Sequence, residues 1–232
     1  MNKPALFITV ACAFLACSWS GNPAGTENSV AVNDIDAKVR QFLNNHRFGW
    51  GDMSVPEVDG QALHDIVLEH GYKNALEIGT STGYSGVWIA WALSKTGGKL
   101  LTIEIDRYRH SQALDNFREA GLSQYIDARL ADAHELVPGL EGPFDFVFCD
   151  ADKGWYTNYF KALIPKLTVG GCFAAHNVSD TSYRRGFRRG FGRDSMVGGF
   201  LEYARSLSDF DTKVLDLRGS AGLSVSYKKA AK

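Results

Sequence analysis

The 232-residue chain has little cysteine, and the few cysteines are scattered. They lie at positions 12, 17, 149 and 172, and no two form a C-x-x-C pair. This pattern excludes a disulfide framework and a paired-cysteine zinc or redox site, because both need regularly spaced cysteines. The fold must therefore rest on an apolar core. A chain of this length with 45% apolar residues can supply such a core as one sizeable domain.

The chain also lacks an excess of charge of either sign. It carries 25 Lys and Arg against 26 Asp and Glu, a formal net charge of -1. This balance argues against a protein whose whole surface binds nucleic acid, but it leaves local basic patches open. One such stretch, residues 183–193, interleaves arginine with aromatic residues, as segments that bind single-stranded RNA do. A solvated lid over a neighbouring site would account for the same stretch.

A long apolar run is missing too, so no transmembrane span is expected. The N-terminal run, residues 5–16, is shorter than the roughly 20 residues that a spanning helix needs. It follows Lys3 and closes at Cys17 in a Phe-Leu-Ala-Cys sequence that resembles a bacterial lipoprotein cleavage site. We therefore expect residues 1–33 to be a signal peptide and flexible tether, with export or lipid anchoring at Cys17; a cytoplasmic location is the alternative. The folded domain is expected to span residues 34–232.

Apolar runs of strand length alternate with amphipathic stretches along this domain. Strands are expected at 74–78, 99–105, 125–130, 144–150, 171–176, 212–217 and 222–227. Helices are expected at 34–45, 58–70, 108–120, 155–167 and 199–207, after residue 133, and around Val87 to Leu93. Strands joined by helical crossovers pair in parallel. The predicted fold class is α/β, a Rossmann-like, open, mostly parallel seven-stranded sheet with helices on both faces, and ligands bind at the carboxyl ends of such strands.

A glycine-rich turn follows the first expected strand. Its glycines, Gly79, Gly83 and Gly86, have neither the G-x-G-x-x-G spacing of dinucleotide sites nor a phosphate-loop pattern. They let the backbone approach a ligand closely, and the next helix points its N–H groups into the same crevice. Glu104 ends the following strand about 20 residues further on, where an acid can accept both hydroxyls of a ribose. The pair predicts a cofactor with a ribose but without a pyrophosphate.

Polar side chains end two later strands. Asp150 ends one, and His176 and Asn177 end the next, with a single helical crossover between them. Parallel neighbours joined in this way end on the same edge of the sheet, so a carboxylate, an imidazole and an amide oxygen can converge there. Three such ligands suggest a divalent metal with positions left open for water or substrate. Each of these residues alone is more often a capping group, so the metal prediction depends on their convergence.

Together these stretches resemble class I S-adenosylmethionine-dependent O-methyltransferases, of the metal-dependent catechol O-methyltransferase type, over residues 33–228. The resemblance implies S-adenosylmethionine as cofactor, one divalent metal, and Lys153 as catalytic residue. For the cofactor it implies Val55, Glu77, Gly79, Ser81, Gly83, Tyr84, Ser85, Glu104, Ile105, Asp132, Ala133 and Asp150. For the metal it implies Asp150, His176 and Asn177. For the substrate it implies Lys153, Asn177 and Glu202, with an aromatic slot rebuilt from Trp50, Met53 and Trp155.

The chain departs from the family pattern at two places. The family normally has an aspartate where His176 stands, so the site loses a negative charge and gains a nitrogen ligand. Magnesium prefers oxygen ligands whereas imidazole suits softer metals, so magnesium is expected but other divalent metals stay open. The family also has a tryptophan between the metal aspartate and the lysine. Here Ala151 and Asp152 intervene, and Trp155 follows the lysine.

The predicted reaction is metal-dependent methyl transfer from S-adenosylmethionine to one hydroxyl of a vicinal diphenol, a small catechol-type molecule. A phenol has a pKa of about 10, so it reacts poorly at neutral pH until its anion is stabilised. The metal would stabilise that anion, Lys153 would accept the proton, and Glu202 would hold the second hydroxyl. Two other hypotheses stay open. One is a tRNA-modifying methyltransferase on the same scaffold that grips phosphates through residues 183–193, and the other is an exported binding module without turnover.

Overall fold

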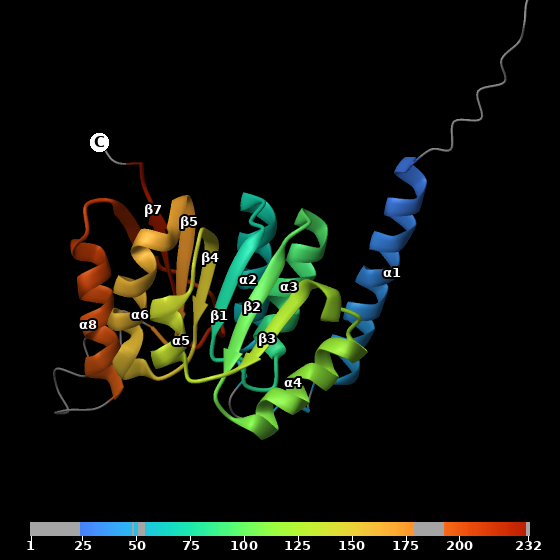
Figure 1. The fold of residues 1–232 in the computed structure, drawn as a ribbon, viewed down its shortest axis with the longest axis horizontal. Helices are drawn as coiled ribbons and strands as arrows, with labels where there is room; N and C mark the ends of the chain where they lie inside the picture. The colour runs from blue at the N-terminus through green and yellow to red at the C-terminus, as the bar shows by residue number, and fades with distance from the viewer. Residues whose placement is uncertain (1–23, 48, 51–53, 179–192, 231–232) are drawn as a thin grey trace, which may run out of the picture.

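The computed structural model describes residues 24–47, 49–50, 54–178 and 193–230. They form one seven-stranded sheet with helices on both faces, in the strand order β3-β2-β1-β4-β5-β7-β6 (Figure 1). Strands β1 to β5 pair in parallel, and β7 is antiparallel to both β5 and β6. The prediction of a Rossmann-like, mostly parallel α/β fold is confirmed.

The elements follow the predicted alternation, with ends that differ by a few residues in most of them. The strands are β1 (Asn74–Ile78), β2 (Lys99–Glu104), β3 (Ile126–Leu130), β4 (Phe144–Cys149), β5 (Leu167–His176), β6 (Phe210–Val214) and β7 (Leu223–Lys228). The helices are α1 (Ala24–Asn45), α2 (Glu57–His70), α3 (Tyr84–Thr96), α4 (Arg107–Glu119), α5 (Ala133–Gly139), α6 (Tyr156–Leu163) and α8 (Arg193–Ser206). Short 3-10 turns are η1 (Ser123–Tyr125), η2 (Lys153–Trp155) and η3 (Ile164–Lys166).

The first helix corrects one prediction. Its backbone is helical from Ala24, although the composition of residues 24–33 predicted a flexible tether and a helix start at Asp34. Val39 and Phe42 are buried and anchor the C-terminal half of α1. A helix that is already nucleated extends by one hydrogen bond per residue, so the weak helix formers at its N-terminal end, residues 24–33, can join it. The expected signal peptide and Cys17 lie outside the described residues, and export therefore stays a prediction.

Strands β1 and β4 lie at the centre of the sheet and are buried on both faces. Ala75 and Phe148 belong to the apolar cluster under α1 to α4, whereas Leu76 and Val147 belong to the cluster under α5, α6 and α8. Side chains alternate between the two faces along a strand, so both clusters draw on the same strands. No helix in the described part of the chain is long and apolar enough to cross a bilayer.

The turns that follow β1 and β4 touch each other through their backbones. The N–H of Asp150 donates to the carbonyl of Ile78 at 2.9 Å. Gly79 has a φ of 97°, and a Cβ at this position would lie 2.6 Å from the carbonyl oxygen of Asp150. Only glycine allows this approach, because it has no Cβ and adopts positive φ without strain. The glycine turn and the Asp150 turn therefore form one unit at the carboxyl edge of the sheet.

Candidate active site

A cavity of about 1100 Å³ opens at the carboxyl ends of the parallel strands. Twelve of the predicted site residues line it: Gly79, Ser81, Tyr84, Ser85, Glu104, Ile105, Asp132, Ala133, Asp150, Lys153, His176 and Asn177. Open α/β sheets bind ligands at this edge, where the loops after neighbouring strands face one another. Of the other predicted cofactor residues, Val55 is buried between two lining residues, Ser54 and Pro56, and Gly83 packs on the Phe117 ring.

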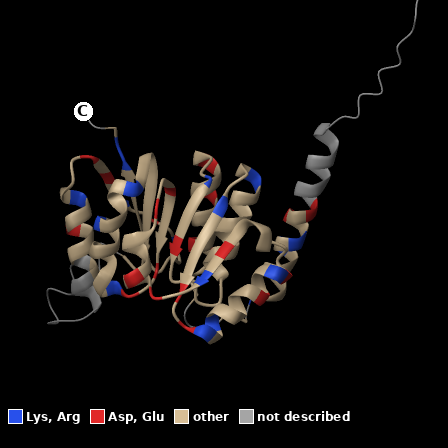
Figure 2. Ribbon diagram, viewed as in Figure 1, with Lys and Arg blue, Asp and Glu red and all other residues tan. Residues whose placement is uncertain are grey.

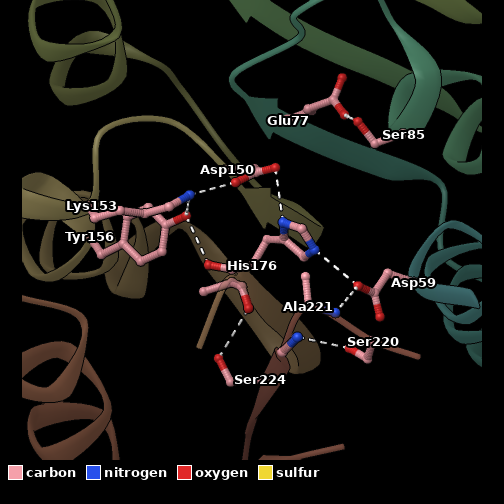
Figure 3. Close-up of polar contacts among 12 residues, drawn as sticks. Asp59, Glu77, Ser85, Asp150, Lys153, Tyr156, His176, Ser220, Ala221 and Ser224 are labelled. Carbon is pink, nitrogen blue, oxygen red and sulfur yellow. Dashed lines mark hydrogen bonds and ion pairs between the residues drawn. The ribbon is translucent and has the colours of Figure 1, made fainter. Parts of the chain in front are cut away.

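Glu77 is a fully buried acid near the end of β1. Its carboxylate accepts hydrogen bonds from Ser85 Oγ and Thr102 Oγ1, each at 2.6 Å, and Figure 3 shows the bond to Ser85. Burial raises the pKa of Glu77 to about 7, because desolvation outweighs these two hydrogen bonds. Ser85 lines the cavity and Glu77 lies behind it, so the acid fixes the direction of the Ser85 hydroxyl.

Glu77→Gln is expected to reduce the loss of stability with rising pH. The pKa of Glu77 is 4.5 ordinarily and about 7 in the folded protein, so its stabilising contribution is full below pH 4.5 and is lost as pH rises through 7. Between pH 5 and pH 8 the wild type should lose about 2 to 3 kcal/mol more of its free energy of unfolding than the variant. Urea unfolding of the cofactor-free protein measures this, with the exposed Glu202→Gln as control. Parallel pH profiles for wild type and Glu77→Gln would contradict the assignment.

Glu104 ends β2 with both carboxylate oxygens held by backbone. Oε2 accepts from the Ser81 N–H at 2.6 Å, and Oε1 accepts from the Asp106 N–H at 2.9 Å. Ser81 has a φ of 49°, and its bond to Glu104 stabilises this left-handed conformation in the glycine turn. The predicted ribose acid is thus fixed at the cavity wall with lone pairs left for further donors. Asp132, the acid of the next loop, instead caps α5 by accepting from the His134 N–H at 2.8 Å.

The predicted aromatic slot is only partly formed. Trp155 stacks on the His134 ring, with centroids 3.9 Å apart, and it is His134 that lines the cavity. Trp50 packs against Tyr84 at 4.5 Å between centroids, and Tyr84 is the lining residue there. Both tryptophans therefore back the wall rather than face the cavity. Met53, the third predicted slot residue, lies outside the described residues.

The structure does not bring Glu202 to the cavity, contrary to its predicted contact with the substrate. The side chain is exposed on α8, whereas Val197 on the same helix is buried and lines the cavity. A helix turns about 100° per residue, so positions five apart point to different sides. Phe200, Leu201 and Ala204 pack inward, which leaves Glu202 facing solvent. The short sequence match could not distinguish these faces.

Asp150 lies between two nitrogen groups (Figure 3). Its Oδ1 is 2.6 Å from Lys153 Nζ, and its Oδ2 is 3.1 Å from His176 Nδ1. Lys153 also donates to the Tyr156 hydroxyl at 2.7 Å, and that hydroxyl donates to the His176 carbonyl at 3.1 Å. Burial raises the pKa of Tyr156 well above 10, so its hydroxyl stays a neutral donor. Lys153 is therefore held at a defined place on the cavity wall.

The sequence did not reveal the second carboxylate that binds His176. Asp59, on α2, places Oδ2 3.0 Å from His176 Nε2 and also accepts from the Ala221 N–H at 3.0 Å. The two residues are 117 positions apart, and Asp59 itself is fully buried. Burial alone would lower the pKa of His176, but the hydrogen bonds to Asp150 and Asp59 outweigh it and raise this pKa above 6.5.

The predicted metal ligands do not fit a divalent metal in this arrangement. Both nitrogens of His176 face carboxylate oxygens, an arrangement that favours a proton on each nitrogen and leaves no lone pair for a metal. Asn177 lines the cavity from an exposed position with a φ of 57°. In residues 24–47, 49–50, 54–178 and 193–230, no group of three or more His, Cys, Asp or Glu could hold a metal ion. Buried Asp59 would compete with a metal for the His176 ring, so His176 as a metal ligand stays a prediction that this arrangement disfavours.

The structure tests the predicted RNA-binding stretch, residues 183–193, only through the charge distribution of the rest of the molecule. Residues 183–192 lie outside the described residues, and Arg193 begins α8. Figure 2 shows Lys and Arg interspersed with Asp and Glu along the described helices and strands. This distribution matches the balanced composition and gives the nucleic-acid hypothesis no added support.

Fold and site together define a class I methyltransferase architecture: a glycine turn after β1, an acid ending β2 and a lysine beside the acid that follows β4, all at one cavity. The chain belongs to the O-methyltransferase family, which it matches over residues 26–181. The predicted family, the class I S-adenosylmethionine-dependent O-methyltransferases, is confirmed.

The chain is similar to other O-methyltransferases. The chain is 41% identical over 134 residues to a catechol O-methyltransferase of Niastella koreensis, covering 56% of this chain and 60% of that protein. It is 37% identical over 146 residues to caffeoyl-CoA O-methyltransferase 1 of Eucalyptus globulus, covering 61% and 58%. The alignments thus span less than two thirds of either relative. The solved O-methyltransferase TomG of Streptomyces achromogenes, in complex with SAM, matches with a TM-score of 0.72 at 25% identity, over 90% of this chain and 100% of TomG.

Proposed function

We propose that this protein transfers the methyl group of S-adenosylmethionine to one hydroxyl of a catechol-type small molecule. One observation carries the proposal: Lys153 Nζ is fixed by Asp150 and Tyr156 at the cavity that the glycine turn and Glu104 also line. The names of the two relatives, a catechol and a caffeoyl-CoA O-methyltransferase, support a hydroxylated aromatic substrate.

The cavity residues fit the cofactor by the chemistry of its parts. Glu104 has acceptor capacity for ribose hydroxyls, and Ser85 and the turn at Gly79 offer a hydroxyl and close backbone to a charged amino-acid end. The loop at Ala133 and His134 offers an apolar and aromatic wall for a purine. When bound, S-adenosylmethionine supplies an electrophilic methyl group on a positively charged sulfur. The solved TomG structure, which holds SAM, supports the same choice.

Lys153 would activate the acceptor hydroxyl. A phenol has a pKa of about 10 and needs a proton acceptor, or a cation beside its oxygen, to react at neutral pH. In the reaction an oxygen–carbon bond forms and the carbon–sulfur bond breaks. The Lys153 ammonium first releases a proton to water, and the resulting amine then takes up the hydroxyl proton, which restores the cation beside Asp150. Asp150 and Tyr156 hold Nζ in place, so the amine need not search for the substrate oxygen. Because His176 and Asp150 do not fit a metal centre here, no step is assigned to one.

A mass-spectrometric assay tests the proposal. The full chain is incubated with S-adenosylmethionine and a panel of vicinal diphenols, monophenols and unmodified tRNA. We expect a product one methyl group heavier from at least one vicinal diphenol and no methylated tRNA. Methylation of tRNA alone would favour the rival enzyme. Binding of S-adenosylmethionine without any methylated product would favour a binding module without turnover.

A further inference from the structure

Four side chains of alternating charge cross the site in one row. Asp59 meets His176 at 3.0 Å, His176 meets Asp150 at 3.1 Å, and Asp150 meets Lys153 at 2.6 Å, as Figure 3 shows. The row comes from four places in the fold: α2, the end of β5, the end of β4 and η2. The side chains of Asp59 and His176 are 0% and 4% exposed, so water does not weaken their pairing. Two carboxylates are thereby matched by two nitrogen cations.

We propose that Asp59 and His176 replace the divalent metal at this site, so that methyl transfer by this protein needs no added metal ion. The inference rests on the proposed function. Asp59 is a positioning residue that acts through the His176 ring. The ring in turn pairs with Asp150 Oδ2 and neutralises its charge; without the ring, this oxygen would be free to bind a cation. His176 and Lys153 together bring two positive charges to this carboxylate pair, the same charge that a divalent ion carries.

The buried carboxylate of Asp59 needs an explanation beyond packing. A buried charge is costly unless it is paired and hydrogen-bonded. Asp59 Oδ2 accepts from His176 and Ala221, but Oδ1 finds no hydrogen-bond partner among the described residues. An apolar residue in its place would avoid that cost, so the position is better explained by what Asp59 does to the His176 ring.

Two glycines hold the elements on either side of this pair. A Cβ on Gly60 would lie 2.4 Å from the Trp88 ring, so α2 packs closely on α3 and fixes the helix that carries Asp59. A Cβ on Gly222 would lie 2.4 Å from the Val178 carbonyl, and Val178 donates its N–H to Gly222 at 3.1 Å. The segment that supplies the Ala221 N–H is thus tied to the residues just after His176. These contacts fix the two segments that supply the groups around the Asp59 carboxylate.

The wild-type test is to assay methyl transfer with and without EDTA, then with added Mg²⁺ or Mn²⁺, and to measure Mn²⁺ binding by electron paramagnetic resonance. We expect unchanged rates and no bound Mn²⁺ at the site. Rates that collapse in EDTA and return with Mg²⁺ would overturn the inference but leave the proposed function standing. If no diphenol is methylated under any condition, the proposed function fails. Mn²⁺ binding then decides whether the row replaces a metal. Binding that Asp150→Asn removes would overturn this inference, and absence of binding supports it.

Variants of the row provide a sharper test. His176→Asp combined with Asp59→Asn puts a second carboxylate beside Asp150 and Asn177 and removes the unpaired buried charge. This oxygen set suits Mg²⁺ or Mn²⁺, so the double variant should bind Mn²⁺ and become sensitive to EDTA. Failure to bind Mn²⁺ in a folded double variant would contradict the argument that the ring excludes metal.

Asp59→Asn alone tests positioning. It should lower kcat by about 100-fold, the cost of a misplaced group, with little change in cofactor affinity. Nuclear magnetic resonance should show two protected ring N–H signals for His176 in the wild type, both absent in His176→Asn, and the Nε2 signal should disappear or move in Asp59→Asn. Unaltered ring signals and unaltered kcat in Asp59→Asn would overturn the positioning role.

Discussion

Replacing Lys153 by methionine should lower kcat for methyl transfer by about 100- to 10,000-fold, the range that a positioned acid or base contributes. Methionine keeps a long, unbranched side chain and removes the amine. That amine lies 2.6 Å from Asp150 Oδ1 and 2.7 Å from the Tyr156 hydroxyl at the cavity wall. Cofactor affinity should change little, because Glu104 and the glycine turn bind through other atoms. Steady-state kinetics and calorimetry with S-adenosylhomocysteine measure the two effects separately.

Two further lysine variants separate the role of Lys153 from general effects. Lys161→Met on α6 removes a lysine that lies over the Tyr203 ring, outside the cavity, and should keep wild-type kcat. Lys153→Arg keeps the positive charge but cannot act as a base, because arginine stays protonated. Low activity in this variant supports proton transfer, and recovery of activity would assign Lys153 a purely electrostatic role. Wild-type kcat in Lys153→Met would refute both roles.

Much of the fold could be predicted because its central strands are simple to recognise. Segments 74–78 and 144–149 are short apolar runs buried on both faces, and helices of crossover length separate the strands. The start of α1 could not be predicted, since residues 24–33 have a loop-like composition and their helix continues one anchored by Val39 and Phe42. In that helix, context rather than local propensity determines the outcome.

The candidate site also has a part that could be predicted from the sequence and a part that could not. Asp150, Lys153, His176 and Asn177 line one cavity because parallel strands end on the same edge, a rule that can be applied to sequence. Asp59 could not be found, because an acid in the first turn of a helix usually stabilises the helix N-terminus and its partner here is 117 positions away. The prediction of His176 as a metal ligand did not take into account that Asp59 also pairs with its ring.

Gly79→Ala should destabilise the protein by about 3 kcal/mol or more and weaken cofactor binding. An alanine Cβ would lie 2.6 Å from the Asp150 carbonyl oxygen, and the φ of 97° is itself unfavourable for alanine. The contact is with backbone, so no side-chain rotation can relieve it. Either the glycine turn or the Asp150 turn must move. Because the Ser81 N–H holds Glu104 from the same turn at 2.6 Å, such a movement should also displace the acid predicted to bind ribose.

Gly97→Ala provides the matched control for Gly79→Ala. Gly97 has a φ of 75° at the end of α3, but nothing lies within 4 Å of an added Cβ. It should therefore show only the backbone cost, about 1 to 2 kcal/mol, and bind cofactor as the wild type does. Urea unfolding and calorimetry with S-adenosylhomocysteine compare the two variants. Equal losses of stability would mean that positive φ alone accounts for Gly79. A larger loss at Gly79, together with weaker cofactor binding, would show that glycine is needed there because the two turns of the site touch.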